Sequence, residues 1–124
     1  MDKSSTIGVV VEHDHNKIKP VTYEVLNAAR NLPGLVSAYY FSNGGEGNLE
    51  SLIEGGADEV RVFLHPDLVH YTHETYAAAL IKEIKKSQPE IILLSASNNG
   101  KELAAAVATS LEVGLATDCI DLQL

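Results

Sequence analysis

Residues 89–111, PEIILLSASNNGKELAAAVATSL, combine an apolar run, a polar turn and a helical pattern in immediate succession. The unbroken apolar run at residues 91–94 is typical of a parallel strand that helices cover on both faces. After the turn, Leu103, Val107 and Leu111 recur at every fourth position, which places them on one face of a helix. Asn99, with Glu102 three residues later, predicts a capping-box start for that helix. The stretch therefore predicts a central parallel strand and its crossover helix.

The rest of the chain repeats this alternation of strand and helix. Further strands are predicted at residues 7–11, 35–41 and 60–64, and helices at residues 20–31, 48–54 and 72–86. Such alternation favours a parallel sheet with helices on both faces. The runs 7–11 and 91–94 are the most uniformly apolar, so we place them side by side and in parallel. The prediction is a three-layer α/β sandwich with a mainly parallel sheet in the order 3-2-1-4-5, in which residues 116–124 form the fifth strand.

Length and charge limit the classes of function. A chain of 124 residues is long enough for one domain, so residues 1–124 are predicted to form a single unit. With 17 acidic and 9 basic residues the net charge is -8, which disfavours nucleic acid as a partner. The sequence has no apolar run of membrane-spanning length, so no membrane insertion is expected. A single cysteine, Cys119, and no signal sequence favour a prokaryotic-like cytoplasmic protein, with a processed organellar protein as the alternative.

The predicted order of strands brings two polar segments to one crevice. Open parallel sheets bind ligands at the carboxyl ends of their strands, where the order of the strands reverses. The candidate residues of this crevice are His13, Asp14, Ser95, Ser97, Asn98, Asn99, Gly100 and Lys101. Neither turn carries a Gly-x-Gly-x-x-Gly or Gly-x-x-x-x-Gly-Lys-Ser/Thr run, which would bring the backbone close to a phosphate. Lys101 is the nearby cation, so a nucleotide site remains one alternative.

Two kinds of chemistry are weaker alternatives for the same residues. His13 with His15, and His70 with His73, form two histidine pairs, but a metal site usually needs three or four convergent ligands. No spacing specifies a nucleophile that a base and a third group orient. We therefore expect neither a metal site nor a catalytic constellation, and the chain is not predicted to be an enzyme.

Several short motifs together resemble one family. They are the run from Val9 to His13, Lys19-Pro20 before a helix with Ala28-Ala29, the run from Gly56 to Val62, the run from Gly100 to Ala104, and Thr117-Asp118. In this order, over nearly the whole chain, they resemble the N-terminal domain of the α subunit of electron transfer flavoproteins. The resemblance implies an α/β domain similar to the adenine nucleotide alpha hydrolase-like folds.

The resemblance also implies partners and a cofactor. Members of the family are heterodimers that carry electrons from flavin dehydrogenases to an acceptor, and this chain would dock on a β subunit as a scaffold. The family's FAD lies mainly in a C-terminal domain of the α subunit, before which this chain ends, so FAD is expected in the full assembly and not on this chain alone. The alternative is a stand-alone nucleotide-binding module resembling universal stress proteins, which would use the same crevice.

Overall fold

A computed structural model describes residues 6–14, 17–42, 49–64, 73–89, 91–95, 97–111, 114–115 and 120–123. The elements, in chain order, are β1 (Thr6–Val10), β2 (His13–Asp14), β3 (Lys17–Ile18), α1 (Pro20–Arg30), β4 (Leu35–Ser42), α2 (Leu49–Glu54), β5 (Glu59–Leu64), α3 (His73–Ser87), β6 (Ile91–Leu94), α4 (Asn98–Leu111), β7 (Gly114–Leu115) and β8 (Ile120–Gln123). The predicted α/β class, with a four-stranded parallel sheet flanked by helices, is confirmed.

The main sheet has the strand order β5-β4-β1-β6-β8-β7. The predicted pairing of the two most apolar strands is confirmed, because β1 and β6 are parallel neighbours, with Ile7 opposite Ile91 and Val9 opposite Leu93. Strands whose inner residues are this apolar occupy these positions because both of their faces lie beneath helices.

The C-terminal edge of the sheet differs from a simple fifth parallel strand. β8 pairs antiparallel with β6, and β7 pairs antiparallel with β8. The short β7, which follows the helix α4, is therefore the outermost strand, and β8 returns between it and β6. Antiparallel neighbours need only a short connection, whereas each parallel neighbour needs a crossover of a dozen residues or more.

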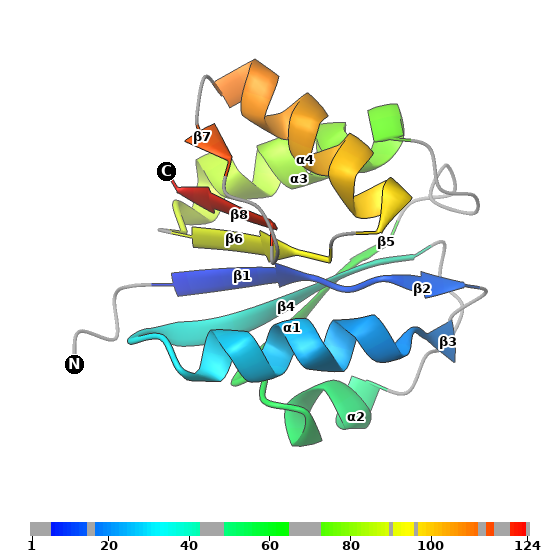
Figure 1. The fold of residues 1–124 in the computed structure, drawn as a ribbon, viewed down its shortest axis with the longest axis vertical. Coiled ribbons are helices and arrows are strands. Elements are labelled where there is room, and N and C mark those ends of the chain that lie inside the picture. Colours follow the sequence, from blue (N-terminus) through cyan, green and yellow to red (C-terminus); the bar gives the residue numbers. More distant parts are fainter. Residues whose placement is uncertain are drawn as a thin grey trace.

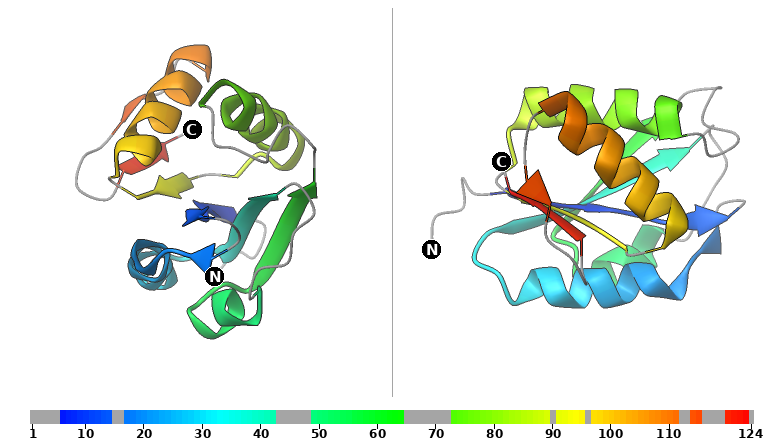
Figure 2. Two further views of the ribbon diagram at one scale, coloured as in Figure 1. Left: turned by 90° about the vertical axis from the view of Figure 1, so that its right-hand side faces the viewer. Right: turned by 45° about the horizontal axis from the view of Figure 1, so that its top comes forward.

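Helices cover both faces of the sheet. Helices α1 and α2 lie on one face, and α3 and α4 lie on the other (Figure 1), which gives the three layers visible in Figure 2. Strand β4 serves both cores by alternation: Tyr39 and Phe41 pack with α3 and α4, while Ala38 and Tyr40 pack on the side of α1 and α2. The two faces thus have separate hydrophobic clusters joined through the strands.

One glycine in the centre of the sheet is required by close packing. A Cβ atom on Gly8 would lie 2.5 Å from a ring carbon of Tyr39 and 2.6 Å from the Cδ1 atom of Ile92. Such distances are far below van der Waals contact. Gly8 therefore lets the Tyr39 ring lie across β1.

Among the described helices none combines the length and apolar character that crossing a bilayer would need.

Candidate functional site: a carboxylate at the switch point

The strand order reverses between β1 and β6, and polar side chains meet there. The chain leaves β1 towards α1 on one face of the sheet and leaves β6 towards α4 on the other (Figure 1). Glu12 follows the last buried residue of the β1 segment, and Ser95 follows β6 directly. This is the position at which open α/β sheets form their ligand sites.

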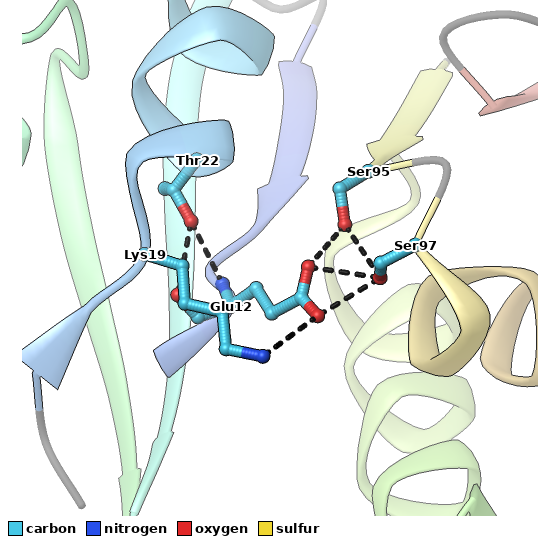
Figure 3. Close-up of polar contacts among 5 residues, drawn as sticks. All are labelled: Glu12, Lys19, Thr22, Ser95 and Ser97. Atoms are coloured by element: carbon cyan, nitrogen blue, oxygen red, sulfur yellow. Dashed lines mark hydrogen bonds and ion pairs between the residues drawn. The ribbon is translucent and has the colours of Figure 1, made fainter. Parts of the chain in front are cut away.

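The Glu12 carboxylate accepts hydrogen bonds from two serines that lie more than 80 positions away (Figure 3). The Ser97 hydroxyl lies 2.8 Å from Oε1 and 2.9 Å from Oε2, and the Ser95 hydroxyl donates to Oε2. The two hydroxyl oxygens lie 3.1 Å apart. On the other side, the Lys19 Nζ atom lies 3.6 Å from Oε1. We call Glu12, Lys19, Thr22, Ser95 and Ser97 the switch-point cluster.

The backbone of Glu12 is fixed as firmly as its side chain. Its N–H donates to the Thr22 hydroxyl at 3.0 Å, and that hydroxyl donates to the Glu12 carbonyl at 3.1 Å. The Lys19 backbone N–H donates to the same carbonyl at 2.8 Å. The start of α1 is thus joined to the end of β1, and the carboxylate is held in one orientation.

The chemistry of the cluster is that of a filled anion site. An ionised carboxylate only accepts hydrogen bonds, while hydroxyl and ammonium groups can donate them. The Glu12 side chain is 12% exposed and the Lys19 side chain 45% exposed, so the carboxylate is the buried partner of the pair. Hydrogen bonds to a charged acceptor are stronger than neutral ones. The cluster therefore positions a carboxylate.

His13, a predicted crevice residue, lies away from the two serines. Its ring stacks on Tyr40, with 4.5 Å between the ring centroids, and its Nε2 atom lies 2.7 Å from the Phe41 carbonyl oxygen. Because a carbonyl only accepts, Nε2 carries the proton in this contact. His13 therefore lies over the end of β4 instead of between β1 and β6. Asp14 belongs to the hairpin of β2 and β3, where its backbone lies opposite that of Lys17 in the strand register.

The remaining predicted residues lie in the turn after β6 and in the first turn of α4. Ser95 and Ser97 meet Glu12, as described above. Asn98, Asn99, Gly100 and Lys101 belong to α4, and the Lys101 side chain is exposed. The predicted capping role of Asn99 is wrong, because α4 begins at Asn98 and the Lys101 N–H donates to the Ser97 carbonyl at 2.9 Å. The first helical hydrogen bond thus starts before Asn99, which lies inside the helix.

Lys19 and Thr22 were missed by the sequence prediction, and Glu12 was expected in the loop at the crevice but not among the candidate site residues. One signal was available for Glu12, because Glu12 and Ser95 are each the first polar residue after an apolar strand. Side chains at such equivalent positions of neighbouring parallel strands come together. No comparable signal marks Lys19 or Thr22, since the short β2–β3 hairpin that returns the chain to Glu12 was not predicted.

A second polar cluster lies along the edge strand β5. Arg61 on β5 contacts the Glu83 carboxylate of α3, donates to the Ser87 hydroxyl at 2.9 Å, and lies 3.5 Å from Glu59. The Ser37 hydroxyl donates to Glu59 at 3.0 Å. We call Ser37, Glu59, Arg61, Glu83 and Ser87 the edge cluster.

Tyr39 lies beside this edge cluster, and its hydroxyl makes no hydrogen bond to a described residue. Burial raises the pKa of Tyr39 to about 12, and the nearby Glu83 carboxylate adds to the shift. Both effects disfavour the phenolate. Tyr39 is thus a neutral core side chain at neutral pH.

Within the described ranges, no three histidine, cysteine, aspartate or glutamate side chains come together as a metal site would need. His15, His70 and Cys119 lie outside those ranges.

The fold and this site define a class: a three-layer α/β domain whose switch point contains its own carboxylate. The family model described as electron transfer flavoprotein domain matches residues 7–124. The chain therefore belongs to the electron transfer flavoprotein family.

Individual relatives agree with this assignment. Subunit LctC of lactate dehydrogenase (NAD(+),ferredoxin) from Acetobacterium woodii is 35% identical over 130 residues, covering 100% of this chain and 31% of LctC. Electron transfer flavoprotein subunit alpha from Thermoanaerobacterium thermosaccharolyticum is 34% identical, covering 100% of this chain and 39% of the subunit. Protein FixB from Rhizobium meliloti is 32% identical, covering 95% of this chain and 36% of FixB. The chain thus spans about a third of the length of these relatives.

The family binds FAD, and the switch-point residues do not fit it. A dinucleotide brings a charged pyrophosphate, which needs backbone N–H groups or cations at close range. Here the serine hydroxyls and Lys19 already meet a carboxylate. A second anion would be repelled by Glu12, so the described residues of this crevice do not fit the pyrophosphate of a dinucleotide.

Proposed function

We propose that the chain serves as the N-terminal domain of an electron transfer flavoprotein α subunit, or of a related protein, where it is a non-catalytic scaffold that docks on a β subunit. The assembly would carry electrons from a flavin dehydrogenase to an acceptor in the cytoplasm, with FAD held outside this domain. The observation that carries the proposal is the Glu12 carboxylate at the switch point. In this domain a side chain fills the crevice where related folds bind a ligand. Such a domain is suited to support the assembly and to dock on a β subunit.

The surface formed by α2 and β5 offers a docking place. Three exposed apolar side chains lie on these two adjacent elements: Ile53 (49% exposed), Val62 (42%) and Leu64 (64%). Val62 and Leu64 share one face of β5 because side chains alternate along a strand. Among the described strands, β5 pairs only with β4, so its outer edge has no partner strand there. Exposed apolar residues on an open strand edge are typical of interaction surfaces.

Charge favours a β subunit over a second copy of this chain as the occupant. Glu50, Glu54 and Asp58 are exposed on α2 and just before β5, and the chain carries a net charge of -8. A second copy would oppose acidic residues to acidic residues, which costs binding energy. The fitting partner surface has an apolar centre and basic residues around it.

A binding measurement with two matched variants tests this proposal. The chain is titrated with an electron transfer flavoprotein β subunit of the same organism in an interferometry or calorimetry experiment. We expect Leu64→Glu to weaken binding at least tenfold, since a charge at the centre of an interface must be desolvated. Leu32→Glu is the control, because Leu32 is also exposed (37%) but lies before β4, at the opposite end of the strands.

Two outcomes would contradict the proposal. If the wild-type chain does not bind the β subunit, the scaffold role is wrong; if both variants bind equally well, the α2–β5 surface is not the interface. Calorimetric titration with FAD, AMP and ATP tests the alternative nucleotide-binding module. Submicromolar binding of AMP or ATP would replace the scaffold function with that alternative.

A further inference from the structure

The Glu12 side chain is held as a bound ligand would be held. Its donors come from two segments that are far apart in the sequence: Lys19 before α1, and Ser95 and Ser97 between β6 and α4. Ser95 is 5% exposed, so its hydroxyl faces the interior. Ser95 and Ser97 face the carboxylate from across the crevice, and Lys19 reaches it from the side of the Glu12 backbone (Figure 3).

We propose that Lys19, Ser95 and Ser97 form an oxyanion-binding site that this chain keeps filled with its own Glu12. The ligand class follows from the donors. Two hydroxyl groups and one ammonium group suit a small oxyanion, either a carboxylate or a phosphate. In the wild-type chain the site is closed, because an external oxyanion would have to share the donors with a fixed negative charge.

The volume of the Glu12 side chain makes the proposal testable. Glu12→Ala removes a CH₂ group and the carboxylate, which together correspond to an acetate ion. The donors remain, and a buried donor that loses its acceptor carries a desolvation cost that a new acceptor relieves. Acetate should therefore bind in the space that the substitution leaves.

The experiment measures the stability of Glu12→Ala in increasing acetate. A ligand that binds only the folded state multiplies the folding equilibrium constant by 1 + [L]/Kd, so acetate at ten times its Kd gives about an 11-fold increase. We expect a saturable rise of the thermal midpoint for Glu12→Ala with acetate, and none with acetamide or with chloride at equal ionic strength. Inorganic phosphate is the second probe, and a response to it would show that the site also accepts the larger oxyanion.

Three further variants serve as controls. Glu12→Gln keeps the volume filled and should not respond to acetate. Glu12→Ala/Ser97→Ala lacks the hydroxyl that contacts both carboxylate oxygens and should lose at least most of the response. Glu24→Ala removes an exposed carboxylate from α1 and should behave like the wild type.

A poorly folded variant remains informative. If Glu12→Ala is unfolded in chloride buffer, circular dichroism during titration with acetate measures the recovery directly. The proposal is overturned if acetate stabilises Glu12→Ala no more than acetamide and chloride do, or if the wild type responds as strongly as the variant. Binding of the β subunit by the wild-type chain is measured in a separate experiment. A negative acetate result therefore does not affect the proposed docking, and a negative docking result does not affect the proposed oxyanion site.

Discussion

Two carboxylates with little exposure, Glu12 (12% exposed) and Glu83 (4%), are held by different partners. Glu12, at the carboxyl ends of β1 and β6, accepts hydrogen bonds from two neutral hydroxyl groups and has a lysine at 3.6 Å. Glu83, in the last turns of α3, is 4% exposed and contacts the Arg61 guanidinium directly. An arginine forms a fixed, planar donor group, whereas a lysine is a mobile point charge. The centre of the edge cluster is therefore an ion pair between Arg61 and Glu83 at the boundary of the core. In the switch-point cluster, by contrast, two hydroxyl groups and a lysine surround the Glu12 carboxylate.

The largest effect is expected from breaking the edge cluster. Arg61→Met leaves the Glu83 carboxylate buried without its cation, and the loss of one partner of a buried pair costs about 3 kcal/mol. This cost lies at the lower end of the range for buried ion pairs because the Arg61 side chain is 40% exposed. Urea denaturation measures the free energy of unfolding, with Arg30→Met, an exposed arginine of α1, as the control. A loss no larger than that of the control would mean that water neutralises Glu83.

A smaller effect is expected at the switch point. Glu12→Ala leaves the Ser95 and Ser97 hydroxyls without their acceptor, at a cost of about 1–2 kcal/mol. The two hydroxyl groups lie 3.1 Å apart and can then hydrogen-bond to each other, which limits the loss. Urea denaturation beside Arg61→Met ranks the two clusters directly. If Glu12→Ala costs more than Arg61→Met, the ranking is reversed.

Lys19→Met should cost at most about 1 kcal/mol, since partly exposed ion pairs contribute little. The Lys19 side chain is 45% exposed, so salt should screen its contribution. Lys17→Met, which removes an exposed lysine of β3, is the matched control. Denaturation at low and high salt tests the prediction, and a difference that persists at high salt would show that Lys19 is essential to the cluster.

Tyr39→Phe should leave stability at neutral pH unchanged or raise it slightly, because the hydroxyl that is removed makes no hydrogen bond to a described residue and a buried polar group without a partner costs free energy. At alkaline pH the variant should differ from the wild type. The pKa of Tyr39 is raised to about 12, so the folded wild type keeps a proton that the unfolded chain loses near pH 10. Stability is therefore fully present below about pH 10 and falls between about pH 10 and 12.

Denaturation at pH 8 and pH 11 measures this difference. We expect wild-type stability to fall more steeply than that of Tyr39→Phe, by up to about 1.4 kcal/mol per pH unit for one proton. The pKa values of Tyr40 and Tyr76 are raised by burial as well, and both tyrosines remain in the variant. Equal slopes would mean that Tyr39 ionises like an exposed tyrosine.

The sequence determined the class of fold and the central pair of strands. Runs such as residues 7–11 and 91–94 are apolar on every side, so only a strand covered on both faces accommodates them. It also predicted where polar side chains would meet, since polar residues directly after such strands lie at the carboxyl edge of the sheet. Ser95 and Ser97 were found in this way.

The tertiary structure alone decided what the site is. Glu12 and Ser97 are separated by 85 positions, and no local pattern specifies which polar groups will meet at such a separation. Because of the hairpin of β2 and β3, His13 contacts β4, and Lys19 and Thr22 lie beside Glu12. The antiparallel return of β8 likewise depends on pairing with β6. Secondary structure follows from periodicity along the chain. Hydrogen-bond partners between distant segments follow from the packing of whole elements. In this domain the packing places the Glu12 carboxylate in the crevice that the sequence predicted.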